Sequence, residues 1–472
     1  DANSLYPNTI ITLNLSPETK IGKIIGIDKE KDEVEIRLVN GKTHILSSEM
    51  FMQYIKKENI AVSKAKTLFS QKVKGIVPEY VDSLYAERVS SQKEVAVVEK
   101  SLAHCKKGSD KYIENKRRME QLDLLQYTLK ILLNSIYGVF SNRQKPSYDL
   151  DCASSITVTG QAVIKEASSI LDEYAKTKYG IQTPITQYND TDSTHVTIKP
   201  ILDALKQPLL DENDQIAPNV YPLAEELKTH LNEKINEWSS NILNSSDSRF
   251  FFKREAICST VLYQAKKRYI LHIKDKGDGS PNPCDKIKPV GVELVKTTMS
   301  DSIKAMIKDI VMTLLKSKSR EQTLEVYRKA YEDFKKLPPE EIAFRSGINT
   351  YEKYAAQAIG FSKAKRTPAA VSAAIYYNNL LKEYNLTMKY EELKAGNRIK
   401  WIYCVPGNRF SIESIAFQDK IPPEFVDIQP DYDKMFKRIL EPAIERLFES
   451  AKWKMVNLQA EYTVDLLDFF KA

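Results

Sequence analysis

Three carboxylates occupy two short segments that are far apart in the sequence. Asp1 opens residues 1–7 (DANSLYP), where a proline-containing turn leads into an apolar stretch. Asp190 and Asp192 belong to the segment YNDTDS inside an alternating run, which predicts a β-hairpin with both carboxylates near its tip. Clustered carboxylates repel one another unless divalent cations neutralise them, which suggests metal-dependent chemistry. The alternative interpretation is an Asx turn in an ordinary hairpin, with Asp1 as a simple cap.

A third segment, KILLNSIYG, places three polar or aromatic side chains on one face of a predicted helix. Lys130, Asn134 and Tyr137 are spaced at i, i+4 and i+7, where an ordinary amphipathic helix would carry leucines. Arg88 follows Tyr85 on the preceding predicted helix and can face the same groove. Taken alone, the face is equally compatible with a lysine that extends over a core tyrosine.

The elements that position these residues follow from the hydrophobic periodicity. Residues 1–62 contain alternating runs, which predict strands joined by a hairpin turn. Period 3.6 over about 78–137 predicts a long helical hairpin, with Ser109 or Asp110 as the cap of its second helix.

Further along the chain, helical and alternating segments succeed one another, which predicts an α+β fold. Residues 300–472 are predicted to be mainly helical, with an irregular stretch marked by Gly and Pro near 396–423. The predicted segments before them are a helix at 158–174, alternation at 185–198, a helix at 223–243 and an extended segment at 257–273.

Composition limits the class of protein. The 472 residues are 42% hydrophobic and 28% charged, which is ordinary for globular proteins and suggests about three domains. No apolar run approaches the roughly 20 residues that span a bilayer, so we predict a soluble, cytoplasmic protein without a membrane partner. Five scattered cysteines without CxxC spacing predict reduced thiols rather than structural zinc. The net charge of +7 is weak evidence for a nucleic-acid partner.

The three segments together resemble motifs A, B and C of family B DNA polymerases, in the family's order. D-x-x-S-L-Y-P begins at Asp1, K-x-x-x-N-S-x-Y-G at Lys130 and Y-x-D-T-D-S at Tyr188. The resemblance is closest to the replicative enzymes of T-even-like phages and covers the chain from motif A onward. Further segments that carry it are 75–78, 157–161, 254–256, 266–269 and 365–368.

The resemblance implies a right-hand polymerase: a palm with an antiparallel sheet plus helices, helical-hairpin fingers and a mainly helical thumb. The boundaries that it implies are palm 1–74 and 143–293, fingers 75–142, and thumb 294–472 with a clamp-docking tail.

The same resemblance implies template-directed DNA synthesis, in which deoxyribonucleotides are added to a primer 3′-hydroxyl with release of pyrophosphate. Asp1 and Asp192 would hold two Mg²⁺ ions, which Mn²⁺ can replace, and Asp190 would support them. Glu255 would lie near the catalytic centre.

For the incoming nucleotide, the resemblance implies that Arg88 and Lys130 neutralise the β- and γ-phosphates. Asn134 would lie near the triphosphate or Arg88, and Tyr137 would stack against the nascent base pair.

The motif A turn has its own implied roles. Ser4 and Leu5 would offer backbone N–H groups to the phosphates, and Tyr6 would be the steric gate that excludes a ribose 2′-hydroxyl. An ordinary packed aromatic residue is the alternative for Tyr6.

Two regions resemble the family's contacts with DNA and with the sliding clamp. A solvated strand face and a packed terminal helix are the respective alternatives. The implied DNA-binding residues are Lys266, Lys267, Arg268, Tyr269, Lys365 and Arg366, and the implied clamp-binding residues are Leu466, Leu467, Phe469 and Phe470.

The sequence departs from the family pattern at two places. Asn189 stands where motif C has Gly, so we expect Asn189 to adopt a left-handed conformation in the turn. The family's second triphosphate-facing cation falls at Gln92, and we assign its role neither to Gln92 nor to the adjacent Lys93.

Three hypotheses for function follow. A DNA polymerase is favoured, because a DNA-binding or clamp-docking subunit without catalysis has no reason to keep clustered, repelling carboxylates. A metal-dependent nuclease would not need the face formed by Lys130, Asn134 and Tyr137. The family's proofreading exonuclease domain lies upstream of motif A, so we expect that activity to come from a separate N-terminal polypeptide or from a missing upstream region.

Overall fold

The computed structural model describes residues 1–295, 299–362, 366–456 and 458. The chain divides into two compact units, Asp1–Ile257 with Asp275–Pro283, and Cys258–Lys274 with Cys284–Ala472. Helices and sheets occur in both, and every strand pair with a described register is antiparallel. The α+β class predicted from the sequence is therefore confirmed.

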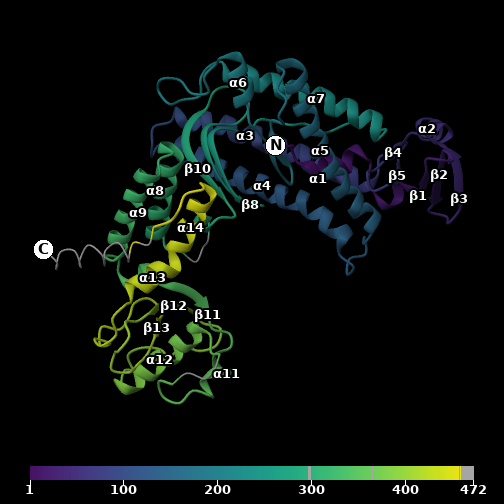
Figure 1. The fold of residues 1–472 in the computed structure, drawn as a ribbon. Helices are drawn as coiled ribbons and strands as arrows, with labels where there is room; N and C mark the ends of the chain where they lie inside the picture. The colour runs from purple at the N-terminus through teal and green to yellow at the C-terminus, as the bar shows by residue number, and fades with distance from the viewer. Residues whose placement is uncertain (296–298, 363–365, 457, 459–472) are drawn as a thin grey trace. The chain divides into compact units, whose positions relative to one another are not determined.

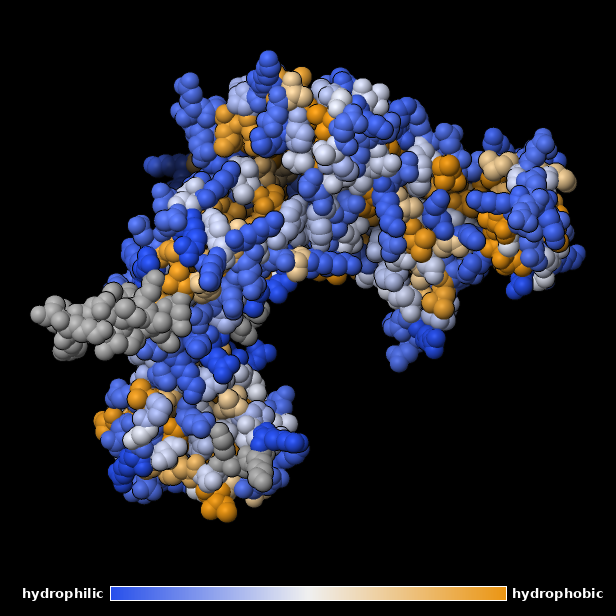
Figure 2. Space-filling view, viewed as in Figure 1, coloured by the Kyte–Doolittle hydropathy of each residue, from blue (hydrophilic) through white to orange (hydrophobic). Residues whose placement is uncertain are grey.

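The first unit begins with helix α1 (Leu5–Thr12) and a five-stranded sheet in the order β3-β2-β1-β5-β4. Helix α2 (Ser48–Lys57) packs on this sheet, and Phe51 and Ile55 belong to its small core. Figure 2 shows apolar side chains at the surface in this part of the chain. Ile45 of β3 is one of its exposed hydrophobic residues. The strands are β1 (Lys20–Asp28), β2 (Glu33–Leu38), β3 (Thr43–Ser47), β4 (Ile60–Val62) and β5 (Thr67–Ser70).

The predicted helical hairpin is confirmed. Helices α3 (Ile76–Ala103) and α4 (Asp110–Ser141) lie side by side (Figure 1). Ser109 caps α4, since its hydroxyl accepts a hydrogen bond from the Tyr112 N–H at 3.3 Å. Leu84, Leu129 and Leu133 are buried in the core that the hairpin shares with α1.

Helix α5 (Leu150–Tyr179) runs through the core of the first unit and is longer at both ends than the predicted helix. The Asp149 side chain caps its N-terminus by accepting from the Cys152 N–H at 3.1 Å, and Gly180 ends it with a positive φ of 70°. The remaining elements of the unit are β6 (Thr186–Asp190), β7 (Ser193–Val196), α6 (Lys199–Leu205) and α7 (Val220–Ile242).

The second unit contains two three-stranded sheets, in the orders β10-β9-β8 and β11-β12-β13. Its strands are β8 (Ala256–Ala265), β9 (Arg268–Lys276), β10 (Pro283–Val290), β11 (Phe344–Gly347), β12 (Arg398–Tyr403) and β13 (Ser414–Phe417). Its helices are α8 (Asp301–Ser317), α9 (Arg320–Phe334), α10 (Pro339–Ile342), α11 (Tyr351–Ala355), α12 (Ala369–Glu383), α13 (Tyr432–Ile439) and α14 (Glu441–Ser450).

The second sheet corrects the prediction of an irregular stretch near 396–423, because β12 and β13 lie within it. These strands are short, and β12 pairs with β11 from a segment more than fifty residues earlier. Short apolar runs carry too little periodicity to show such a partner.

Within the described ranges, no helix is long and apolar enough to cross a bilayer. The five cysteines are free thiols, as predicted. Lys365 and the four predicted clamp-binding residues lie outside the described residues.

Candidate active site

Backbone pairing brings the first and third motif segments together in the first unit. The Ala2 N–H donates to the Asp192 carbonyl at 2.7 Å. Ala2 also forms an antiparallel bridge with Phe252, and the Lys253 N–H donates to the Asp1 carbonyl at 3.0 Å. The two predicted metal-binding residues, Asp1 and Asp192, are therefore held as neighbours although the sequence separates them widely.

Strands β6 and β7 form the predicted hairpin, with Asp190 paired to Ser193 and the two-residue turn Thr191-Asp192 between them. The left-handed residue of this turn is Thr191, with φ of 58°, rather than Asn189. The expectation for Asn189 is wrong, because that residue pairs with Thr194 inside the strands and needs no positive φ.

Burial and neighbouring negative charges act together on the Asp192 carboxyl. The residue is exposed at the tip of the turn, but its carboxyl group is largely surrounded by protein. This burial, followed by repulsion from Asp190 and Glu255, raises the pKa of the Asp192 carboxyl. A cation at this position would relieve both effects, because it would stabilise the charged form of the carboxyl.

The segment that carries Glu255 is anchored by a buried ion pair of the preceding residue. The Glu255 carbonyl accepts from the Gly277 N–H at 2.8 Å. The preceding residue, Arg254, pairs through its guanidinium with Asp275, whose side chain is 0% exposed. Asp275 also accepts from the Asn282 N–H at 2.6 Å. The segment that carries Glu255 is thus fixed by charge and by backbone hydrogen bonds.

Helix α3 docks on the motif A turn. The Asn3 side-chain amide donates to the Tyr85 hydroxyl, and an Arg88 Nη1 donates to the Ser4 hydroxyl at 3.1 Å. Arg88 is half-buried, and its Nε lacks a hydrogen-bond partner among the described residues. Burial, only partly offset by Tyr85, lowers the pKa of Arg88. A guanidinium with an unsatisfied donor beside the carboxylate segment is suited to an anionic ligand.

Helix α4 presents the predicted polar face. Lys130 and Asn134 are exposed, and neither forms a hydrogen bond or ion pair within the part of the chain that the structure describes. The buried side of the same helix carries Leu129 and Leu133. Lys130 and Asn134 are therefore not used for packing, and both remain available to a ligand.

The Tyr6 ring lies between two helices. Its centroid is 5.6 Å from that of Tyr137 on α4, with the rings tilted by 53°. Helix α5 also approaches this ring, because a Cβ at Gly160 would lie 3.3 Å from it. The predicted gate and the predicted stacking residue thus form one aromatic pair, and Gly160 leaves the space that it needs.

In the second unit, the predicted extended segment 257–273 is confirmed as strand, but it is two strands, and the turn between them was not predicted. Strands β8 and β9 join at Lys266-Lys267, both exposed, and Lys267 takes a positive φ of 60°. Lysine gives no turn signal in the sequence, which explains the error. The Tyr269 side chain is buried near Tyr263, and Arg268 Nη2 lies 2.9 Å from Glu293. Arg366 is exposed.

The donor set fits Mg²⁺ bound together with a substrate. In the described ranges, no group of three acidic, His or Cys side chains lies close enough to form a complete metal cage. Mg²⁺ in phosphate-transfer sites is usually held by one or two carboxylates plus substrate phosphates and water. Asp1 and Asp192 are neighbours through their backbones, and Asp190 and Glu255 act on the Asp192 carboxyl, so the carboxylates that such a smaller set needs are present in this region.

Sequence reasoning missed two residues that position the site. These residues are Asn3 and Asp275, and neither is among the site residues predicted from the sequence. The usable signal for Asp275 was a charged residue at the end of an apolar strand, where an unpaired charge would be costly. No local feature of the sequence identifies Arg254 as the partner of Asp275.

A family model described as DNA polymerase family B matches residues 1–451. Relatives include the DNA-directed DNA polymerase of Escherichia phage RB69, 23% identical over 452 residues, and that of Enterobacteria phage T4, 21% identical over 496. These matches cover 88% and 96% of this chain, but 48% and 53% of the relatives. The DNA polymerase of Thermococcus gorgonarius is 22% identical, with 98% and 46% covered. The chain thus spans about half the length of the relatives it matches.

Asp275→Asn would leave the Arg254 guanidinium buried without a counter-ion. We expect the free energy of unfolding, measured by denaturant titration, to fall by about 3 kcal/mol. The matched control is Asp278→Asn, whose partly exposed side chain pairs with Lys228 at 2.9 Å. That change should cost less than about 1 kcal/mol, and equal losses in the two variants would contradict the anchoring role of Asp275.

Proposed function

The chain belongs to DNA polymerase family B, and on that basis we propose that it performs template-directed DNA synthesis. In this reaction a deoxyribonucleotide is added to a primer 3′-hydroxyl, and pyrophosphate is released. The observation that carries the proposal is the pairing of Ala2 with Asp192, which joins the carboxylate segments next to the docked helix α3.

We propose that Asp1 and Asp192 hold two Mg²⁺ ions, with Asp190 in support. Bound there, the ions would lower the pKa of the primer 3′-hydroxyl and hold the triphosphate, and Mn²⁺ can replace them. The raised pKa of the Asp192 carboxyl supports this role, since a cation would stabilise its charged form.

The cations of the helical hairpin would act on the leaving group. Arg88 and Lys130 would neutralise the β- and γ-phosphates as pyrophosphate gains charge. Asn134 would orient the triphosphate, and Tyr137 would stack on the nascent base pair. The exposure of Lys130 and Asn134 and the unsatisfied donor of Arg88 support these roles.

The turn before α1 would complete the nucleotide site. Leu5 begins the helix, so its N–H has no carbonyl partner inside that helix and can meet a phosphate, as can the N–H of Ser4. Tyr6 would exclude a ribose 2′-hydroxyl. Its fixed place between Tyr137 and Gly160 supports a steric role.

For DNA, we propose that Lys266 and Lys267 contact phosphates from their turn, with Lys365 and Arg366 as further contacts. Arg268 and Tyr269 complete the K-K-R-Y segment. We also propose the family's part names for the chain. These are palm 1–74 and 143–293, fingers 75–142, and thumb 294–472, boundaries that differ from those of the two compact units.

The remaining partners are proposals from the resemblance alone. They are primer-template DNA, deoxyribonucleoside triphosphates, a sliding clamp that binds the tail, and a separate polypeptide or upstream region with exonuclease activity. A phage-encoded enzyme of this kind would work in the cytoplasm of its bacterial host.

The first test is primer extension with Mg²⁺ by the Asp192→Ala variant. Because a bridging carboxylate would be lost, we expect extension to become undetectable while primer-template affinity changes less than about threefold. Asp203→Ala, which removes an exposed carboxylate paired with Lys199, should extend normally. Extension by Asp192→Ala would refute the metal assignment. DNA binding without extension by the unmodified chain would favour the non-catalytic alternative.

Two lysines should separate nucleotide use from DNA binding. Lys130→Ala should lower kcat/KM for the nucleotide by roughly 10²-fold with little change in DNA affinity. Lys267→Ala should weaken DNA binding and reduce its salt slope by about 0.9. Lys111→Ala, at an exposed position on α4, serves as the control. The assignments fail if Lys130→Ala acts mainly on DNA affinity.

Tyr6→Ala should relax sugar selection. We expect the preference for deoxyribonucleotides over ribonucleotides, measured as a ratio of kcat/KM values, to fall at least about tenfold because the ring is lost. Tyr6→Phe keeps the ring and should keep the preference. Unchanged selectivity in Tyr6→Ala would leave Tyr6 as an ordinary packed aromatic residue.

A further inference from the structure

Arg268 follows the Lys266-Lys267 turn but is engaged within the protein. Its Nη2 lies 2.9 and 3.1 Å from the two carboxylate oxygens of Glu293, and its side chain is 33% exposed. A single guanidinium nitrogen thus bonds to both carboxylate oxygens, which is a charge-assisted contact. Arg268 is therefore less exposed than Lys266 and Lys267 beside it.

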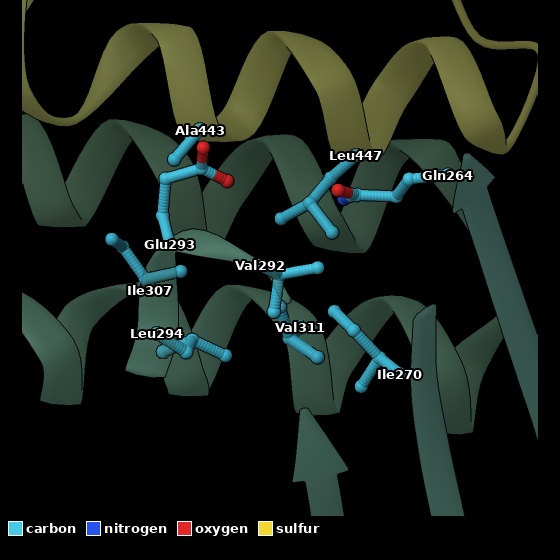
Figure 3. A pocket seen from close by; sticks show the side chains of 9 residues that line it. All are labelled: Gln264, Ile270, Val292, Glu293, Leu294, Ile307, Val311, Ala443 and Leu447. Atoms are coloured by element: carbon cyan, nitrogen blue, oxygen red, sulfur yellow. The ribbon is translucent and has the colours of Figure 1, made fainter. Parts of the chain in front are cut away.

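Glu293 is shared between two guanidinium groups. Its side chain is 7% exposed, and Arg446 Nη2, from α14, lies 2.5 Å from the same oxygen that Arg268 contacts. Figure 3 shows the Glu293 carboxylate beside Ala443 of α14, above the apolar side chains of Ile307 and Val311. In such surroundings the carboxylate of Glu293 holds the two positively charged guanidinium groups close together.

A close backbone approach places Glu293 beside the turn. Gly291 has a positive φ of 63°, and a Cβ there would lie 2.1 Å from the Lys267 carbonyl oxygen and 3.3 Å from Arg268 Cγ. Only glycine lets the chain pass so near the turn. The turn is thus held twice, by the backbone at Gly291 and by the ion pairs at Glu293.

We propose that Glu293 is a positioning residue that fixes the Lys266-Lys267 turn for contact with nucleic-acid phosphates. Arg268 links the turn to Glu293, and Arg446 links Glu293 to α14. Arg268 thereby acts through the turn and not as a phosphate ligand itself. A preordered turn loses less conformational entropy when its lysines meet phosphates. This inference rests on the proposed function, because it assumes that the turn binds DNA.

The test is the salt dependence of primer-template binding by Glu293→Gln. Removing a negative charge from a DNA-binding surface should by itself tighten binding. If Glu293 positions the turn, the change instead weakens affinity about fivefold and lowers the salt slope by about one. Glu449→Gln, an equal charge change at an exposed site on α14, should leave affinity unchanged or slightly tighter. Tighter or unchanged binding by Glu293→Gln would overturn the proposal.

A double-mutant cycle shows whether Glu293 acts through the turn. Lys267→Ala should weaken binding about fivefold in the unmodified chain and less than twofold in Glu293→Gln. Equal effects in both backgrounds would overturn the positioning role. If thermal unfolding shows that Glu293→Gln is not folded, Glu293→Asp replaces it. The shorter side chain keeps the charge but loosens the pairs, and unchanged affinity in that variant would refute the proposal.

The ion pair between Arg268 and Glu293 can also be measured without DNA. This measurement distinguishes a failure of the positioning role from a failure of the proposed function. A thermal-unfolding cycle of Arg268→Lys and Glu293→Gln should be non-additive, because both changes break one ion pair. Additive effects would show that Arg268 and Glu293 do not act as a pair, whatever the chain binds, and would refute the proposal. Absence of DNA binding by the unmodified chain would refute the proposed function, and the positioning role with it.

Discussion

The candidate site depends on a few backbone hydrogen bonds that hold like charges together. The Ala2 N–H bonds to the Asp192 carbonyl, and the Lys253 N–H bonds to the Asp1 carbonyl. Each such bond stabilises the fold by about 1 kcal/mol and is indifferent to the side-chain charge. The backbones of Asp1 and Asp192 therefore stay close because of these bonds, while Asp190 and Glu255 repel the charged form of the Asp192 carboxyl. The same turn receives Arg88 at Ser4, so cation and carboxylates are positioned from one short segment.

Much of this arrangement could be predicted from the sequence, because its signals are local. Periodicity and a serine cap predicted the helical hairpin, and Ser109 caps α4 as expected. Alternation predicted the β6–β7 hairpin with its acidic tip. The order of three motifs predicted the family, which the match to DNA polymerase family B confirms.

The parts that escaped prediction depend on partners far away in the sequence. Strand β12 pairs with β11 across a long separation, and Arg254 meets Asp275 only after the chain has folded. Turn conformation was also misplaced, because the left-handed residue at the acidic tip is Thr191. Neither threonine nor lysine favours a positive φ, so local propensity does not predict the left-handed conformation of Thr191 or of Lys267.

The packing of Gly160 behind Tyr6 has a consequence for how sugar selectivity could drift. With Tyr6 as the proposed gate, the distance that its ring can retreat is set by α5, which has no proposed substrate contact. A single added carbon at position 160 would lie 3.3 Å from the ring, which would have to shift by a few tenths of an ångström. With Tyr6 in its proposed role, the selectivity for deoxyribonucleotides would then also depend on how α5 packs against the ring.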